Sequence, residues 1–479
     1  MMSSLETSTR ALRAQQLGLD ITSNNIANVN TPGYTRQAPV LTQTDPRSVM
    51  QVSYGTGTVI NSIKNFREEH LDREMRNSLS RQSGFTYDNR IFQQIQTAMS
   101  EPSDYGLDTA FDSFFKSVEQ LTNKPDDVSL RSSLLAQAKS LTTTFNTIGQ
   151  GLQDLRQQVY NQLDANVTAS NRLLAGIADI NSSITTAAND KDLSPSVLLD
   201  KQNTLIEELS KLGNVSVLRN PSGSATVSLN GLTVVNNGES LKLNVDRSAD
   251  PLTGEITARI AVLDAKSNEI GTYKPVVGEI AAQMKMYNQT LDDKELSDGF
   301  SVPRNLNDLA RGFAEAVNAV TANGYGLSDP AGPPPGRALF VPNGAADITA
   351  LTIDVNAELL ADVRKVPASA TALTPGNNTV IRALGQLVNN TNVMDGLTAR
   401  EYYGMTLTDL ANMGADSLSG QAVADATVQQ IGSQRENITG VNMDEEAINM
   451  IKYQRAFEAA ARMVSATSDM MKSIINLGL

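Results

Sequence analysis

The sequence has no cysteine, no tryptophan and only one histidine in its 479 residues. Without cysteine, no disulfide framework, thiolate metal site or cysteine nucleophile can form. The one histidine, His70, lies in the strongly charged stretch 67–73, a pattern typical of a solvated helix face. It supplies neither the paired histidines of a zinc protease nor a convincing base for a serine triad. We therefore expect no catalytic or metal-binding histidine.

Basic clusters and long apolar runs are also missing. The 39 lysines and arginines are outnumbered by 52 aspartates and glutamates, which gives a formal net charge of −13. Nucleic-acid binding needs a concentrated basic surface, so we expect no nucleic-acid partner. No apolar run approaches the length of a membrane-spanning helix, and residues 1–6 lack the basic and apolar regions of a cleaved secretory signal. We therefore expect no membrane partner.

Phosphate-binding and calcium-binding loops are absent as well. The segment 55–57, Gly-Thr-Gly, lacks the remaining glycine of a dinucleotide loop, and no Gly-Lys-Ser or Gly-Lys-Thr cradle occurs. The acidic pairs at 126–127 and 292–293 lack the glycine and terminal glutamate of a calcium loop. Such pairs are usually solvated, so we expect no cofactor, no metal ion and no enzymatic activity.

The N-terminal stretch 3–29, in contrast, has a clear helical pattern. Four apolar residues recur at seven-residue spacing, which places them along one narrow stripe of a helix: Leu5, Leu12, Leu19 and Ile26. Pro32 and Gly33 then end the helical pattern. Short extended pieces are expected from 37 to 63.

The C-terminal stretch 443–477 has no glycine or proline and predicts one helix of about 50 Å at ~1.5 Å per residue. Its apolar residues form two adjacent rows with the same spacing: Met450, Phe457, Val464 and Met471 in the first, and Ala456, Met463 and Met470 in the second. The acidic residues 444–446 in its first turn favour the helix dipole. Pairing of the two terminal helices is the simplest explanation of both patterns. The alternative is that each helix packs on its local neighbours.

Between the termini the pattern is helical from 66 to 184, from 278 to 321 and from 377 to 437. The period changes to two between 215 and 277, where turn signals indicate hairpins. A Gly/Pro-rich loop at 324–336 precedes a second β-leaning patch at 339–355. The sequence therefore predicts a mainly α, discontinuous multidomain fold. It combines a terminal coiled-coil domain (1–60 plus 438–479), an elongated helical bundle domain (61–212 plus 278–437) and an inserted β-rich outer domain (213–277).

Two terminal motifs carry a resemblance to a known family. The segment 11–37 closely resembles the N-terminal signature of flagellar rod, hook and hook-associated proteins. Its core, SNNIANVNTPGY, includes Ser23, Asn24, Asn25, Ile26, Ala27, Asn28, Asn30, Thr31, Pro32, Gly33 and Tyr34. The segment 440–462 is similar to the matching C-terminal signature, and its V-N-x-D-E-E motif is nearer to hook-associated members than to rod or hook proteins. Segments 102–115 and 198–210 are similar to hook-associated members too.

The resemblance implies a structural subunit at the junction between hook and filament of the bacterial flagellum. It implies export through the flagellar type III apparatus without a cleaved signal peptide, to an extracellular location. Its implied partners are other copies in a ring, the hook protein, the next hook-associated protein and an export chaperone. The first apolar row of each terminal helix would pair the helices, and Ala456, Met463 and Met470 would contact neighbouring subunits.

Three alternatives stay open. Another axial flagellar protein, of the hook or distal rod, shares the N-terminal signature. An adhesin-like binding module on the β-rich domain belongs to a different functional class. The motif asparagines, finally, can be explained by local capping of a helix end.

Overall fold

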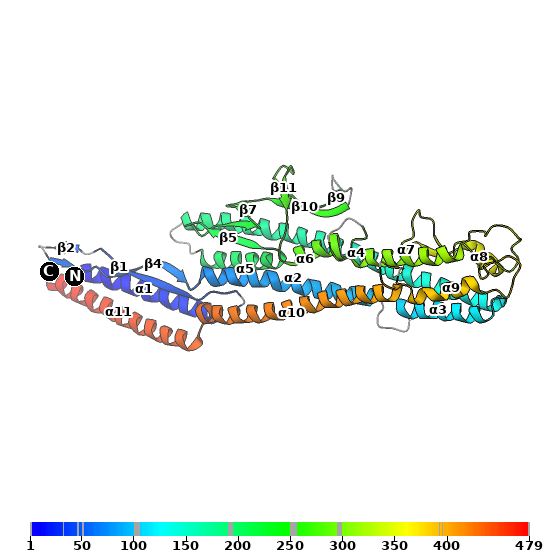
Figure 1. Cartoon of the computed structure of the whole chain (residues 1–479). Coiled ribbons are helices and arrows are strands. Elements are labelled where there is room, and N and C mark those ends of the chain that lie inside the picture. The colour runs from blue at the N-terminus through cyan, green and yellow to red at the C-terminus, as the bar shows by residue number, and fades with distance from the viewer. Residues whose placement is uncertain are drawn as a thin grey trace.

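The computed structural model describes residues 2–31, 33–45, 47–49, 52–99, 106–189, 195–249, 256–294, 299–391, 393–394 and 396–477. These residues form an elongated and mainly helical molecule (Figure 1). The long terminal helices pack together at one end, a helical bundle forms the middle, and small sheets are inserted along it. The predicted fold class is therefore confirmed.

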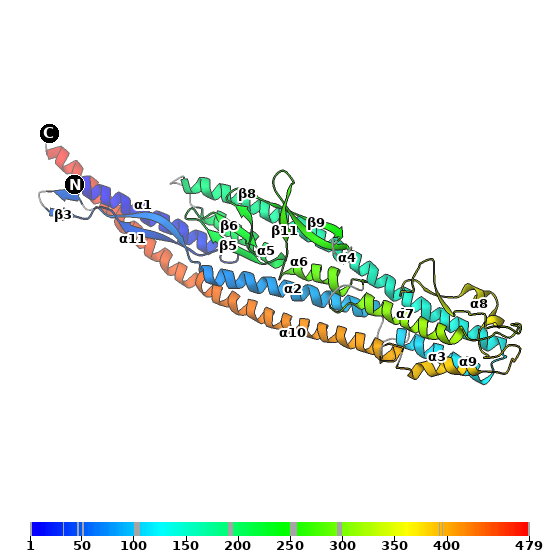
Figure 2. The ribbon, with the colours of Figure 1, turned by 45° about the horizontal axis from the view of Figure 1, so that its top comes forward.

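The terminal helices run antiparallel to each other. Helix α1 (Met2–Ala27) and helix α11 (Met443–Leu477) agree with the predicted stretches and lie side by side in both ribbon views (Figures 1 and 2). Strands β1 (Gln37–Gln43) and β4 (Thr58–Asn65) form an antiparallel hairpin that packs along α1. The tip of this hairpin carries two shorter strands, β2 (Arg47–Val49) and β3 (Val52–Tyr54). Extended structure was predicted here.

The body is built on long helices. These are α2 (Glu69–Met99), α3 (Leu107–Asn123), the 62-residue α4 (Val128–Asn189), α5 (Ser196–Leu212) and α10 (Ala399–Thr439). Helix α4 is about 90 Å long at ~1.5 Å per residue, and α10 packs along α2. Phe313 packs α7 (Val302–Thr321) against α3 at the end of the molecule away from the chain termini. Its ring meets the rings of Phe111 and Phe114 edge-on, with 5.0 and 5.7 Å between ring centroids. His70 is exposed on α2, as its charged surroundings predicted.

Two antiparallel sheets lie against α4, where the sequence predicted hairpins. The four-stranded sheet has the order β5-β6-β7-β8 and the three-stranded sheet the order β11-β10-β9. Their strands are β5 (Val215–Arg219), β6 (Ala225–Leu229), β7 (Leu232–Asn236), β8 (Glu239–Ser240), β9 (Lys242–Ala249), β10 (Ile256–Leu263) and β11 (Glu269–Tyr273). Asn181 of α4 both donates to and accepts from the backbone of Ala225, at 2.8 Å each. The sheets share one continuous apolar core with the helices, and the domain boundaries given above stay a prediction.

The stretches 278–321 and 377–437, where the sequence has a helical pattern, each contain more than one helix. Between 278 and 321, α6 (Glu279–Lys285) passes into a π-helical turn (Met286–Thr290), and α7 (Val302–Thr321) begins anew. Ser301 caps α7 by accepting from the backbone N–H of Arg304. Between 377 and 437, α9 (Thr379–Gln386) and a 3-10 turn (Leu387–Asn389) precede α10, which starts with a capping box of Thr398 and Glu401.

The far end of the molecule carries short elements. The β-leaning patch becomes a small hairpin of β12 (Phe340–Pro342) and β13 (Ile353–Val355). Helix α8 (Ala357–Ala361) and a 3-10 turn (Val363–Lys365) follow. The Gly/Pro-rich segment 324–336 contains no helix and only an isolated β-bridge, at Tyr325, in agreement with the predicted loop.

Candidate functional site

The contact between α1 and α11 is centred on small and polar residues. On α1 the buried residues with described side chains are Ser8, Ala14, Gly18, Ile21, Thr22 and Asn25, and on α11 they are Glu446, Ala460 and Thr467. Gly18 allows the closest approach, because a Cβ atom there would lie 2.8 Å from the ring of Tyr453. The helix backbones can therefore pack closely along this line.

The predicted apolar rows lie on either side of that line. Half-buried positions on α1 are Leu5, Leu12, Leu19 and Ile26, and half-buried positions on α11 are Met450, Phe457, Val464, Met471 and Ala456. In contrast, the side chains of Met463 and Met470 are 57% and 51% exposed. The structure thus brings the first rows of both helices beside the shared contact and turns the two methionines outward.

Asn25 connects the end of α1 to two distant segments. Its Nδ2 donates to the backbone oxygen of Gln37 at 2.8 Å and to Glu446 Oε2 at 3.1 Å. Its Oδ1 accepts from the N–H of Gln37 at 3.1 Å and from the hydroxyl of Tyr34 at 2.8 Å. With 1% exposure, Asn25 has all of its hydrogen-bonding capacity used inside the protein. It fixes the start of β1 and the first turn of α11 against α1.

Other motif residues act locally. Asn28 donates to both oxygens of Asn24, each at 2.9 Å, and accepts from the hydroxyl of Thr31 at 3.1 Å. These bonds agree with the local capping alternative for these residues. Gly33 has a φ of +80°, which favours glycine. The side chains of Ser23, Ala27 and Asn30 are exposed, and Pro32 lies outside the described residues.

Arg36 links the N-terminal and C-terminal motifs through ion pairs. Its guanidinium binds Glu446 Oε1 at 2.8 Å and Glu445 Oε2 at 2.9 Å, and its backbone N–H donates to the oxygen of Thr439 at 2.9 Å. Glu446 is 2% exposed, so this ion pair is largely shielded from water. The sequence alone does not reveal this pairing, because acidic residues in the first turn of a helix are already explained by the helix dipole.

A second charged network joins this region to the body. Asp200 of α5 accepts from the N–H of Thr35 at 3.3 Å and pairs with Arg67 at 3.5 Å. Arg435 of α10 pairs with Glu207 at 2.6 Å and with Asp72 at 3.3 Å. Burial raises the pKa of Asp200, although Thr35 and Arg67 oppose the shift. The segment after the motif is therefore held between the terminal helices and three helices of the body.

Burial also keeps Tyr34 in its neutral form. Burial, followed by the charges of Asp200 and Glu446, raises the pKa of Tyr34 to about 12. The hydroxyl therefore keeps its proton at any physiological pH and remains a donor to Asn25.

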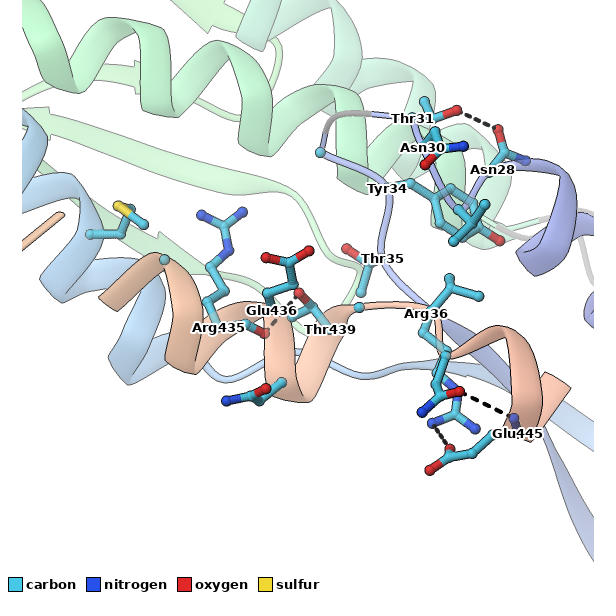
Figure 3. A pocket seen from close by; sticks show the side chains of 18 of the residues that line it. Asn28, Asn30, Thr31, Tyr34, Thr35, Arg36, Arg435, Glu436, Thr439 and Glu445 are labelled. Atoms are coloured by element: carbon cyan, nitrogen blue, oxygen red, sulfur yellow. Dashed lines mark hydrogen bonds and ion pairs between the residues drawn. The ribbon is translucent and has the colours of Figure 1, made fainter. Parts of the chain in front are cut away.

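A hollow of about 920 Å³ opens between the motif turn, the end of α10 and the start of α11 (Figure 3). Its lining is mostly polar and includes Asn28, Asn30, Arg36, Arg435, Glu436 and Glu445. Across the described ranges, no group of three or more His, Cys, Asp or Glu side chains could hold a metal ion. No helix in the same ranges is long and apolar enough to span a membrane. The hollow therefore lies where the N-terminal motif, α10 and α11 meet.

Comparison with protein families matches three segments that together make up about two thirds of the chain. Residues 92–340 match the model of the "flagellar hook-associated protein FlgK helical domain", which covers more than half of the sequence. The chain belongs to the FlgK family. The ends match models of flagellar rod proteins: residues 5–35 match the "flagella basal body rod protein" and residues 433–477 match the "flagellar basal body rod FlgEFG protein C-terminal". These two matches contain the terminal motifs.

Individual FlgK family members cover the full length. Flagellar hook-associated protein 1 of Bacillus subtilis is 28% identical, with 98% of this chain and 97% of that protein covered. The protein of the same name from Escherichia coli is 23% identical, with 100% of both chains covered. The solved flagellar hook junction protein FlgK from Burkholderia pseudomallei has 17% identity and a TM-score of 0.63, and covers 77% of this chain and 100% of its own. At that identity the likeness is one of fold.

Membership in the FlgK family fixes the general role of the chain. It is a structural component of the axial part of the bacterial flagellum, an extracellular appendage. Its relatives are structural proteins and not enzymes, which supports the expectation of no enzymatic activity. As an axial component, it assembles with other axial components.

Proposed function

We propose that the chain forms the junction between hook and filament, as a ring of identical subunits on the distal end of the hook. The resemblance of its C-terminal motif to hook-associated members supports this position over the hook or the distal rod. Its partners in this proposal are the hook protein on one side and the next hook-associated protein on the other. Export through the flagellar type III apparatus, without a cleaved signal and with a chaperone, rests on the same resemblance.

Domains 1–60 and 438–479 together would be the assembly domain in this proposal. Leu5, Leu12, Leu19 and Ile26 would support pairing of α1 with α11, together with Met450, Phe457, Val464 and Met471. The bundle and the β-rich segment would lie outside this assembly domain. The paired helices would stack on those of neighbouring subunits.

One observation carries the proposal: α11 has apolar side chains that the described part of the chain leaves exposed. Ile448, Met463, Met470 and Ile474 are 65%, 57%, 51% and 51% exposed, and helical spacing places them along one flank of the helix, beside the face that packs on α1. Several exposed apolar side chains on one flank of a helix favour a contact with another protein. Burying each side chain contributes about 1.5–3 kcal/mol. Neighbouring subunits are the occupants that we propose.

Substituting Met463 and Met470 together by glutamine is expected to prevent stable incorporation. The change keeps the volume of both side chains but removes apolar area from the contact between neighbouring subunits. Each such contact should weaken by roughly 3 kcal/mol or more. This corresponds to about a hundredfold in the equilibrium constant of the contact. Both side chains are exposed, so the monomer should fold normally. Quantification of the variant on isolated hooks tests this expectation.

Leu218→Gln is the matched control, because Leu218 is 70% exposed on β5, far from α11. The control should be incorporated like the unmodified protein. Equal incorporation of the methionine variant and the control would contradict the proposed contact.

Position in the flagellum can be tested directly, because the chain has no cysteine of its own. A Leu218→Cys variant labelled with maleimide-gold is expected to give a narrow band between hook and filament in electron micrographs of intact cells. Labelling along the whole hook would support the hook-protein alternative. Labelling confined to the basal body would support the rod alternative.

A further inference from the structure

Helix α10 has an exposed stripe that no described part of its own chain covers. No lysine or arginine occurs between Arg400 and Arg435. Along this stretch, exposed residues recur every three or four positions and thus lie on one side of the helix. The members of this α10 stripe are Met405, Asp409, Asn412, Asp416, Ser419 and Val423.

The opposite side of α10 is already occupied. Leu410, Ser417 and Ala424 are buried against α2, and a Cβ atom at Gly420 would lie 2.6 Å from the ring of Phe85. Asp425 on this inner side accepts from Gln82 at 2.7 Å, whereas Asp409 and Asp416 have no ion pair within the described part of the chain. The stripe therefore offers two unpaired negative charges between apolar ends, and Val423 is 66% exposed.

A groove with complementary character lies elsewhere on the same molecule. It has a volume of about 640 Å³ and runs between α2, the segment 274–278 and the start of α6. Its walls are mostly apolar and include Phe85, Pro275, Val276 and Met284. Val276 is 68% exposed. Such a surface favours an apolar occupant.

The rim of the groove is basic although the whole chain is acidic. Arg81, Lys274 and Lys285 line it and are exposed, against the single carboxylate of Asp88. Arg81 and Lys274 make no ion pair with any described residue. In a chain with a net charge of −13, three cations around an apolar groove are locally well matched to an acidic partner surface.

The environment of Asp88 is a second, independent indication that another molecule fills the groove. Its Oδ1 atom is buried and has no hydrogen-bond partner among the residues that the structure describes. Burial raises the pKa of Asp88 to about 6, and Lys285 opposes the shift. A buried acceptor without a donor costs free energy. The α10 stripe carries two hydrogen-bond donors for this oxygen, the hydroxyl of Ser419 and the side-chain amide of Asn412. The rest of the stripe matches the groove in charge and in its apolar ends.

The two surfaces cannot meet within one chain. In both ribbon views α2 runs between α10 and α6, and α10 is held on α2 by its inner side (Figures 1 and 2). A contact between them would join two copies through different faces, which is the type of interface that produces rings or helical arrays. From this arrangement we propose that the α10 stripe of one copy docks in the groove of a second copy. The inference rests on the proposed self-assembly and adds a contact separate from α11.

Cross-linking of assembled hooks tests the contact. In a double variant, Val276→Cys and Val423→Cys, the only thiols lie one on each proposed surface. Treatment of isolated hook structures with a short bismaleimide is expected to give a ladder of dimers, trimers and larger multiples of the chain. Each single-cysteine variant, and a control pair of Val197→Cys with Val423→Cys, should remain monomeric on a denaturing gel. Val197 is 57% exposed on α5.

A charge exchange makes the test specific. Adding Asp409→Lys and Asp416→Lys to the double-cysteine variant should abolish the ladder. Adding Arg81→Glu and Lys274→Glu as well should restore it, because the charges are again opposite. Restoration would be difficult to explain if the substitutions had only disturbed folding.

The outcomes separate the two proposals. The double-cysteine variant present in hooks without a ladder would overturn the docking contact and leave the junction function intact. Cross-linking of the single Val423→Cys variant would also overturn it, because α10 would then face another α10. Absence of the unmodified protein from isolated hooks would overturn the junction function, and the docking contact with it.

Discussion

Cells that produce the chain without residues 443–479 are expected to be non-motile, with hooks that carry no filaments. The deletion removes Glu446, the partner of Arg36 and Asn25, and it uncovers the inner side of α1. Most of the stability of a helix in a protein comes from the packing of its apolar face, and α1 loses this packing in the variant. The outward apolar surface of α11 is lost with it. Electron microscopy of cell-bound hooks, with an assay for filament protein in the medium, measures the result.

The body of the truncated protein should remain folded, because its buried apolar core lies between residues 87 and 410. Far-UV circular dichroism of the purified variant, and its detection in the medium, separate failed assembly from misfolding or failed export. Truncated protein recovered from the medium in folded form, together with bare hooks, is the expected combination. Normal filaments would contradict both the junction function and the role of α11 in assembly.

The lengths of the terminal helices could be read from the sequence, but the residues at the centre of their contact could not. Seven-residue spacing of large apolar side chains identified both helices. The centre of the contact instead uses Ala14, Gly18 and Ala460, because small residues let the two backbones approach. A count of large apolar residues cannot detect such a line. Only the position of Tyr453 opposite Gly18 makes the reason for the glycine visible.

The charged contacts of the site could also not be predicted from a single sequence. Arg36 and Glu446 are 410 positions apart, and each has an ordinary explanation when read alone. The role of Asn25 shows the same limit, since local capping explained all motif asparagines equally well. The structure separates them: Asn24 and Asn28 bond within the turn, whereas Asn25 bonds across to α11.

The breaks between helices within 278–321 and 377–437 differ from these contacts, because local signals for them are present in the sequence. Ser301 followed by Pro303 is a helix-start pattern, and Thr398 with Glu401 three residues later is a capping box. The π-helical turn at Met286–Thr290 had no comparable signal in the sequence.

Replacement of Arg131 by methionine is expected to destabilise the body strongly. Arg131 lies near the start of α4, is 1% exposed, and donates from Nε to the backbone oxygen of Pro125 at 2.8 Å and from Nη1 to that of Val366 at 2.5 Å. Burial lowers the pKa of its guanidinium to about 10, so it stays charged at neutral pH. Methionine fills similar space but leaves two buried carbonyl oxygens without donors. At about 1–3 kcal/mol for each, the free energy of unfolding should fall by roughly 2–6 kcal/mol.

Arg400→Met is the matched control for that substitution. Arg400 pairs with Asp108 and Asp112 at 2.7 and 2.8 Å, but its side chain is 42% exposed. Exposed ion pairs of this kind contribute about 0–1 kcal/mol. Urea unfolding of both variants, followed by circular dichroism, should therefore show a large loss for Arg131→Met and little change for Arg400→Met. Equal losses would mean that the buried carbonyl oxygens find other donors and that Arg131 does not hold the segments around Pro125 and Val366 together.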